Sequence, residues 1–263
     1  MSEPGAFFPS LINPAKAITI IVHGLNNKPS AMMPLVYFMQ SLGSDVFLVS
    51  LSGHTDNWSD PGLITRNQWL EDIFKVYTQV TARKENDSTH RMYFLGFSLG
   101  ALANLDLMCS KPGEITYDKM ILLGPANALR NHAQIFQGLT KAILPGSWKI
   151  PSLVPAAYRA SKFTPVQAYK ILFEMEQSVQ NAACSQLNIP TLVFIDPKDE
   201  LVSLRGLRKF IDKFNLTNWQ MIEIHKRFTN ASTYHHLILD EKSVGTENWL
   251  LIQSSIRSFL NEL

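Results

Sequence analysis

The residues best suited to chemistry surround Ser98, in the pentapeptide Gly96-Phe97-Ser98-Leu99-Gly100. An apolar run over residues 91–95 precedes the pentapeptide and strong helix formers over residues 101–108 follow it, which predicts a strand, a tight turn and a helix. Such a turn exposes the serine hydroxyl, and the flanking glycines let strand and helix approach closely. The next backbone N–H, that of Leu99, would face an oxygen that becomes negative during attack on a carbonyl. A tight glycine turn whose serine has no catalytic role could have the same pentapeptide sequence, but the strand-turn-helix context favours a nucleophile.

A serine hydroxyl is a weak nucleophile, so it needs a base within hydrogen-bond reach and a carboxylate to orient that base. Three carboxylates, Asp196, Asp199 and Glu200, follow a late apolar run. Two histidines, His235 and His236, follow the last predicted strand. Serine, acid and then histidine is the chain order that accompanies a strand-turn-helix nucleophile. The residue types alone leave the choice of acid and of base open.

The composition suits one large domain with a sizeable core. The chain has 263 residues, of which 46% are hydrophobic and 17% charged, and this balance argues against disorder. The net charge is only +2 and Lys and Arg are scattered, so no nucleic-acid partner is expected. The two cysteines, Cys109 and Cys184, have no zinc-type spacing; reduced thiols are expected, with a disulfide between them as the alternative. No metal and no organic cofactor is implied.

The sequence contains no recognisable targeting or membrane segment. Its first residues lack the basic and apolar regions of a signal peptide. No apolar run approaches the roughly 20 residues of a membrane-spanning helix. A cytoplasmic protein is therefore expected.

Predicted strands and helices alternate along the chain. The strands are expected at 17–22, 45–51, 91–95, 119–123, 191–195 and 219–224, and helices at 33–42, 65–82, 101–108 and 246–260. This alternation predicts the α/β class, with a mostly parallel sheet covered by helices on both faces. No convincing strand occurs between residues 128 and 185. We therefore expect a core formed by residues 1–127 and 186–263, and a helical cap insertion at 128–185 above the carboxyl edge of the sheet.

The sequence resembles the serine hydrolases of the α/β-hydrolase superfamily, in the branch of monoglyceride-lipase-like enzymes and carboxylesterases. The resemblance rests on the Ser98 pentapeptide, on His23-Gly24-Leu25 after the first strong strand, and on Asp199-Glu200-Leu201-Val202. It spans residues 18–260 and is weakest across the 128–185 insertion. It implies the α/β-hydrolase fold.

The same resemblance selects Asp199 among the three carboxylates. In this branch the acid is the aspartate of an Asp-x-hydrophobic-Val pattern, which residues 199–202 match. Asp196 stands where the family usually has glycine, and is expected to bond its own backbone in a turn. Glu200 is expected to be a solvated loop charge.

For the base, the resemblance implies His235. In related carboxylesterases the catalytic histidine precedes an apolar stretch that ends in a carboxylate five positions later. His235 has this spacing to Asp240, whereas His236 is one residue short. His236 is then expected to form a wall of the substrate pocket or to face the solvent beside it.

The oxyanion hole is implied by the family's His-Gly-x pattern. Its donors would be the backbone N–H groups of Leu25 and Leu99. His23 and Gly24 are expected to shape this loop and to border the substrate pocket.

The implied activity is hydrolysis of small to medium apolar acyl esters through an acyl-enzyme. Thioesterase or amidase activity on the same fold is an alternative, because the triad does not choose the leaving group. A non-catalytic ligand-binding module is the alternative from another class. The cap insertion is expected to set substrate size, with Phe136 and Trp148 at the pocket, and to make transient contact with a lipid surface. Packing between two helices would explain its apolar residues equally well.

Overall fold

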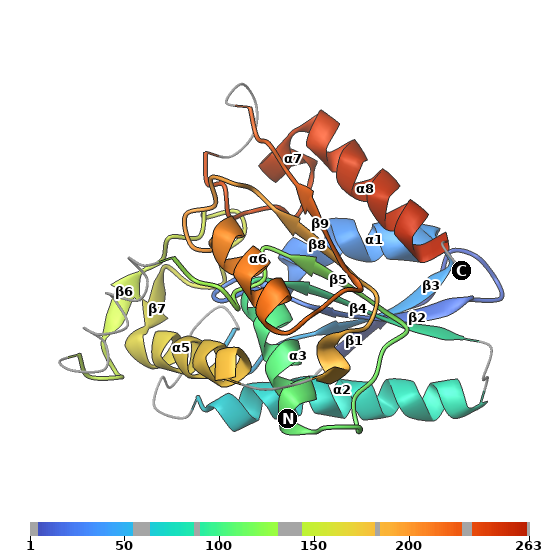
Figure 1. Ribbon diagram of the computed structural model, residues 1–263, viewed down its shortest axis with the longest axis horizontal. Helices are drawn as coiled ribbons and strands as arrows, with labels where there is room; N and C mark the ends of the chain where they lie inside the picture. The colour runs from blue at the N-terminus through green and yellow to red at the C-terminus, as the bar shows by residue number, and fades with distance from the viewer. Residues whose placement is uncertain are drawn as a thin grey trace.

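The arrangement of the chain comes from a computed structural model, which describes residues 5–54, 64–86, 90–130, 144–181, 185–227 and 233–261. Within these residues, seven strands form one sheet in the order β1-β3-β2-β4-β5-β8-β9 (Figure 1). The strands are β1 (Gly5–Phe8), β2 (Ala17–Val22), β3 (Ser44–Val49), β4 (Arg91–Phe97), β5 (Lys119–Leu123), β8 (Thr191–Ile195) and β9 (Trp219–Glu223). β1 is antiparallel to β3, and the other neighbouring pairs are parallel. The predicted α/β class with a mostly parallel sheet is confirmed.

The central strands are short apolar runs because both faces of the sheet are covered. Every residue of β2 and of β8 is buried. The strands predicted at 17–22, 119–123 and 191–195 coincide with β2, β5 and β8. β4 extends to Phe97, beyond the predicted 91–95, because its last two residues pair with β5. This extension carries the strand directly to Ser98.

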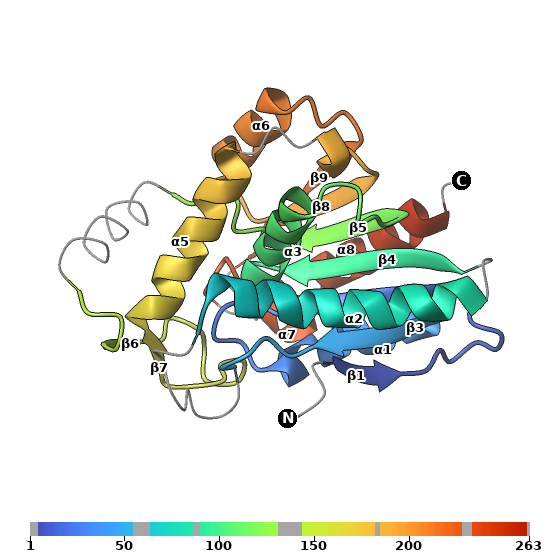
Figure 2. The ribbon, with the colours of Figure 1, turned by 90° about the horizontal axis from the view of Figure 1, so that it is seen from below.

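Helices pack on both faces of the sheet and bury two apolar layers (Figure 1 and Figure 2). One face is covered by α1 (Met33–Ser41), α7 (Glu241–Val244) and α8 (Thr246–Asn261), and the other by α2 (Arg66–Asn86), α3 (Leu99–Ser110) and α6 (Leu204–Lys213). α5 (Val166–Asn181) packs against α3 rather than on the sheet. The four predicted helices correspond to α1, α2, α3 and α8. Among the described residues, no helix combines the length and apolar character needed to cross a membrane.

The segment over residues 144–181 stands at the carboxyl end of the strands, outside the sheet (Figure 2). It contains a short antiparallel hairpin of β6 (Lys149–Pro151) and β7 (Phe163–Pro165), followed by α5. The expectation of a purely helical insertion without strands is therefore wrong in this part. Strands of three residues are too short to show the alternation that marks a strand in a sequence. Residues 131–143, which include Phe136, lie outside the described residues.

The loop after β2 fastens this hairpin segment to the core. The Asn26 side chain donates hydrogen bonds to Ser161 O at 2.8 Å and to Thr164 Oγ1 at 3.0 Å. Further along the segment, the Tyr158 hydroxyl donates to Asp240 Oδ1 at 2.9 Å. These polar contacts hold the hairpin beside the end of β4, where Ser98 lies.

Candidate active site

Ser98 occupies a strained turn between β4 and α3. Its φ of 51° and ψ of −114° lie in a region that residues with side chains rarely adopt. The backbone on both sides fixes this conformation. Ser98 N donates to Leu123 O at 2.9 Å, and Leu102 N donates to Ser98 O at 3.1 Å. The predicted strand-turn-helix unit around Ser98 is confirmed.

The two flanking glycines allow a close approach that no other residue would permit. A Cβ atom on Gly96 would lie 2.7 Å from Ala101 Cα in α3. A Cβ atom on Gly100 would overlap the carbonyl oxygens of Val22 and His23 at the end of β2. Because these neighbours are backbone atoms, they cannot move aside as a flexible side chain could. The start of α3 is thus pressed against the end of β2.

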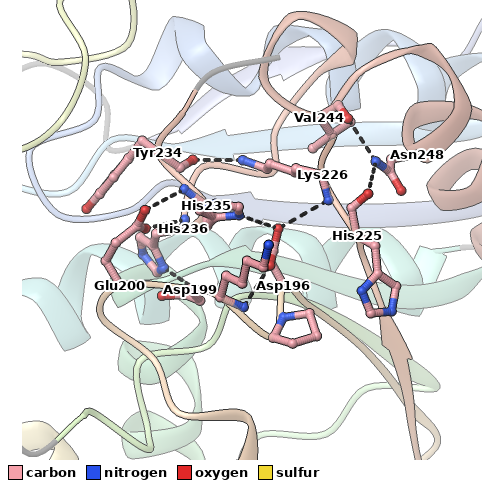
Figure 3. Close-up of polar contacts among 12 residues, drawn as sticks. Asp196, Asp199, Glu200, His225, Lys226, Tyr234, His235, His236, Val244 and Asn248 are labelled. Carbon is pink, nitrogen blue, oxygen red and sulfur yellow. Dashed lines mark hydrogen bonds and ion pairs between the residues drawn. The ribbon is translucent and has the colours of Figure 1, made fainter. Parts of the chain in front are cut away.

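Ser98, His236 and Asp199 form a continuous chain of hydrogen bonds. Ser98 Oγ lies 2.8 Å from His236 Nε2, and His236 Nδ1 lies 2.7 Å from Asp199 Oδ2. All three residues are buried. The other Asp199 oxygen accepts the N–H groups of Leu201 and Val202, each at 2.8 Å. These bonds orient the carboxylate toward His236 (Figure 3).

The expectation that His235 contacts Ser98 is corrected by this geometry. The His235 ring turns to Asp196 instead, with Nδ1 2.8 Å from Asp196 Oδ2 (Figure 3). Adjacent residues in an irregular turn point in different directions, so a one-residue difference changes the partner completely. The five-residue spacing from His235 to Asp240 did not identify the base, because Asp240 has another role. It is the N-cap of α7, and its side chain accepts Ser243 N at 2.8 Å.

Asp196 behaves as a turn residue and also holds a histidine. Its Oδ1 accepts Lys198 N at 2.8 Å, which confirms the expected side-chain bond within the turn. Its Oδ2 faces His235. Two Asp–His pairs therefore lie side by side, and only the pair of Asp199 and His236 reaches Ser98.

Two charged residues around the histidines have no motif that would identify them in the sequence. Glu200 is not the expected solvated charge, since its carboxylate accepts the backbone N–H groups of His235 and His236, each at 2.9 Å. Lys226 follows β9 and donates from Nζ to the carbonyl oxygens of Tyr234 and Leu237. A glutamate beside an aspartate and a lysine after a strand look like ordinary surface residues in a sequence. Only the folded chain reveals their partners.

His23 and Gly24 lie in the loop after β2 but do not border either cavity at Ser98. The expectation that they border the substrate pocket is therefore corrected. His23 is fully buried, with Nδ1 2.9 Å from Gly24 O, while Leu51 N donates to Nε2 at 3.1 Å. Burial lowers the pKa of His23 from 6.5 to about 4, against a smaller opposite effect of the bond to Gly24. Gly24 packs on the Phe97 ring, which a Cβ atom would meet at 2.8 Å.

Two cavities meet at Ser98. The larger, of about 230 Å³, is mostly apolar. It is lined by Leu25, Ser98, Ala126, Leu129, Ile150, Pro151, Leu153, Tyr169, Leu172, Phe173, Leu201 and Val202. The smaller, of about 60 Å³, also reaches His236, and its walls combine polar and apolar side chains. The polar ones include Asn26, Asn27, Ser152, Thr164 and Tyr234, and the apolar ones are Leu25, Phe97, Leu153, Val154, Leu201 and Leu237.

Trp148 does not take the expected place in the pocket. Its side chain is 58% exposed, and neither cavity at Ser98 includes it. Trp148 precedes β6 on the outside of the hairpin, whereas Ile150 and Leu153 face the larger cavity. In a short irregular segment, the sequence does not indicate whether an apolar side chain such as Trp148 is exposed or buried.

The two backbone groups expected at the oxyanion hole lie close to Ser98 in the fold. Leu99 is the first residue of α3, directly after Ser98. Leu25 lies in the loop after β2 and borders both cavities. In the described part of the chain, no group of three or more His, Cys, Asp or Glu side chains is arranged to hold a metal ion.

Comparisons with known proteins agree with this fold. The family described as "Serine aminopeptidase, S33" matches residues 13–157. The monoglyceride lipase of Saccharomyces cerevisiae, solved with a substrate analog, aligns with a TM-score of 0.78 at 13% identity, over 98% of this chain and 91% of that chain. The monoacylglycerol lipase of Paleococcus ferrophilus aligns with a TM-score of 0.72 at 15% identity, over 97% and 98%. Est1E of Butyrivibrio proteoclasticus, solved with ferulic acid, aligns with a TM-score of 0.62 at 16% identity, over 98% and 94%. No curated protein matched the sequence significantly.

The buried neutral state of His23 predicts a specific loss of stability in acid. The pKa of His23 in the folded protein, about 4, lies below the ordinary 6.5. Its contribution to the free energy of unfolding is therefore fully present above pH 6.5 and is lost as the pH falls through about 4. The full difference corresponds to about 3 kcal/mol. Urea unfolding at about pH 7 and about pH 4 should show a smaller pH-dependent loss in His23→Gln than in the unaltered protein.

The matched control is His225→Gln, since the side chain of His225 is 71% exposed. This variant should lose stability with falling pH as the unaltered protein does. An equal loss in His23→Gln would mean that His23 is not held neutral.

Proposed function

The chain belongs to the serine aminopeptidase, S33 family, and from this premise we propose that it is a carboxylic ester hydrolase that works through an acyl-enzyme on Ser98. The observation that carries the proposal is the hydrogen-bonded chain from Ser98 through His236 to Asp199, placed at the meeting point of two cavities. A nucleophile, a base and an orienting carboxylate in contact meet the geometric requirement for acyl transfer.

In the proposed mechanism, Ser98 Oγ attacks the carbonyl carbon of the ester while His236 Nε2 takes the hydroxyl proton. Asp199 holds the ring and stabilises the imidazolium that forms. The backbone N–H groups of Leu25 and Leu99 stabilise the negative oxygen of the tetrahedral intermediate. When the intermediate collapses, the C–O bond to the alcohol breaks and His236 returns the proton to the leaving oxygen. Water then attacks the acyl-enzyme by the same route and releases the acid.

The two cavities suggest which part of the ester lies where. We assign the acyl chain to the apolar cavity of about 230 Å³, because burial of methylene groups there is favourable. The smaller cavity, with Asn27 and Thr164 on its walls, would take a polar alcohol. The likeness to two monoacylglycerol lipases and to an esterase supports an ester substrate over a thioester or an amide.

A catalytically idle ligand-binding protein is the rival from another class. Such a protein has no need for a serine held in a strained conformation against a histidine. The experiment below separates the two, because an idle protein neither turns over an ester nor reacts with a fluorophosphonate.

We also propose transient contact with a lipid surface through the β6–β7 hairpin. Trp148, Leu153 and Phe163 are 58%, 66% and 46% exposed, and Lys149 and Lys162 are exposed next to two of them. Leu153 also borders both cavities, so the exposed apolar side chains begin at the substrate site. Apolar and basic side chains together are typical of surfaces that lie on lipid headgroups.

Substitution of Ser98 or of His236 should remove turnover of a p-nitrophenyl ester. Ser98→Ala and His236→Ala are expected to lower kcat/KM by on the order of 10⁴- to 10⁶-fold, because the residues act as a unit. A fluorophosphonate should label Ser98 alone, as shown by peptide mass spectrometry. His235→Gln should keep most of its turnover, since the His235 ring bonds to Asp196. Turnover in Ser98→Ala, or a greater loss in His235→Gln than in His236→Ala, would refute the assignment.

The apolar cavity should select esters by acyl length. Each CH₂ that enters it contributes about 0.8 kcal/mol, so kcat/KM should rise about fourfold per carbon until the cavity is full and then fall. Leu172→Phe narrows the cavity and should move the maximum to a shorter chain, whereas Trp148→Ala should leave the profile unchanged. If kcat/KM does not depend on acyl length, or if Leu172→Phe does not alter that dependence, this cavity does not bind the acyl chain.

Lipid contact can be measured by co-sedimentation with phosphatidylcholine vesicles that contain anionic lipid. The triple variant Trp148→Ser, Leu153→Ser and Phe163→Ser should bind less, because its exposed apolar area is smaller. The control is Leu250→Ser with Leu251→Ser, which removes exposed leucines (58% and 40%) from α8. If both variants sediment like the unaltered protein, the hairpin is not a lipid-binding surface.

A further inference from the structure

The turn that carries His236 is held by two opposite charges. Glu200 accepts the N–H groups of His235 through Oε1 and of His236 through Oε2, each at 2.9 Å. Lys226 Nζ donates to Tyr234 O at 2.7 Å and also to Leu237 O. Figure 3 shows the carboxylate on one side of the turn and the lysine on the other. The N–H groups of the two histidines and the carbonyl groups that flank them are thus bound by ionic side chains.

The two charged residues come from different parts of the fold. Glu200 lies in the loop after β8, next to Asp199, so it connects the acid and the base. Lys226 lies after β9, and its backbone N–H faces Asp196 Oδ2 at 3.4 Å. The turn also has a backbone hydrogen bond of its own, from Leu237 N to Tyr234 O at 3.2 Å, between the contacts of Glu200 and of Lys226. The position of the His236 ring therefore depends on contacts between loops and not on a regular element.

Lys226 is an unusual residue to find at this place, because it is only 7% exposed. Burial of an ammonium group is unfavourable, and an apolar side chain would avoid that cost. Burial lowers the pKa of Lys226 from 10.5 to about 8, although nearby carboxylates act in the opposite direction. The contacts of Nζ with two peptide carbonyls show what the charge does there: it binds the turn.

We propose that Lys226 and Glu200 are positioning residues for His236, which together keep Nε2 within reach of Ser98 Oγ. The proposal rests on the proposed function, since it assigns these residues to the base of that mechanism. Neither residue borders the cavities at Ser98, so neither is placed to touch the substrate. Their loss should therefore act on kcat much more than on KM.

The proposal gives kcat a dependence on pH that has a definite sign. Below about pH 8 Lys226 is an ammonium and binds the carbonyls strongly, whereas above about pH 8 it becomes a neutral amine and binds them more weakly. Activity should therefore fall as the pH rises through about 8. The groups that face Lys226 are Asp196, Asp199 and Glu200 from the loop after β8, and Asp240 from the start of α7. Tyr234, His235 and His236 belong to the bound turn, and burial raises the pKa of Tyr234.

The test compares Lys226→Met, Lys226→Arg and Glu200→Gln with the unaltered protein, in p-nitrophenyl ester hydrolysis from about pH 6 to about pH 10. Lys226→Met should lower kcat about 10- to 100-fold with KM within about twofold, and should lack the fall near pH 8. Lys226→Arg keeps its charge at high pH, so it should recover part of kcat and also lack that fall. Glu200→Gln should lower kcat, because the two N–H groups bind separate carboxylate oxygens and the amide replaces one of these with an NH2 donor. The matched control is Lys209→Met, at an exposed position on α6, which should behave like the unaltered protein.

A spectroscopic readout separates this proposal from the proposed function. The Nδ1–H proton of His236, bonded to Asp199, should give a low-field proton resonance whether or not the protein hydrolyses an ester. Lys226→Met should weaken or broaden this resonance, and Lys226→Arg should restore it. If the unaltered protein has no esterase turnover but the resonance responds in this way, the function is wrong and the positioning role stands.

Three results would overturn the positioning role. One is an unchanged kcat, pH profile and resonance in Lys226→Met. Another is a rise in KM with kcat unchanged, which would make Lys226 a binding residue. The third is a loss of fold in Lys226→Met, seen by circular dichroism, together with unaltered kcat and pH profile in folded Lys226→Arg and Glu200→Gln, which would make the contacts structural only.

Discussion

Close contact between the start of α3 and the end of β2 is the constraint on which the site depends. Gly100 leaves no room for a Cβ atom against the carbonyl oxygens of Val22 and His23, so the helix begins as near to the sheet as backbone atoms permit. This closeness holds Ser98 in a strained conformation with positive φ and places the residue at the carboxyl end of β4. The same contact sets the loop after β2 beside Ser98, where Leu25 borders both cavities. A steric limit in the backbone thus determines where the chemistry can occur.

Around this rigid point, the remaining groups are placed by loops that hold one another. Asp199 is fixed by two backbone N–H groups, and the turn of His236 is fixed by Glu200 and Lys226. Asp199, His236 and Lys226 are buried and Glu200 is partly buried. Away from water, hydrogen bonds of charged and polar groups are stronger and unpaired groups are costly. Polar contacts therefore hold Asp199 and His236 in place, whereas backbone geometry holds Ser98.

The solved structures that resemble this chain share its fold at 13–16% identity, and a shared fold does not by itself identify the particular substrate. The features that would choose a substrate belong to the hairpin segment and its neighbours. Ile150 and Leu153 border the larger cavity, and Asn26 fastens the segment to the core. Contacts between the segment and the core therefore shape the cavities in which the proposed substrate would bind.

The sequence by itself determined the parallel strands of the sheet and the turn at Ser98, because each depends on local order: apolar runs and glycine spacing. The choice of Asp199 needed the resemblance of residues 199–202 to a family pattern, since Asp196 and Glu200 are equivalent to it by residue type. Only the tertiary structure decided which histidine faces Ser98, since His235 and His236 are equivalent by type and their loop has no periodicity. It also decided that Trp148 is outside while Leu153 borders the site, and that Glu200 and Lys226 bind one turn from two sides. Those outcomes depend on which loops meet in space, and the direction of a side chain in an irregular loop is set by its partners rather than by its neighbours in the chain.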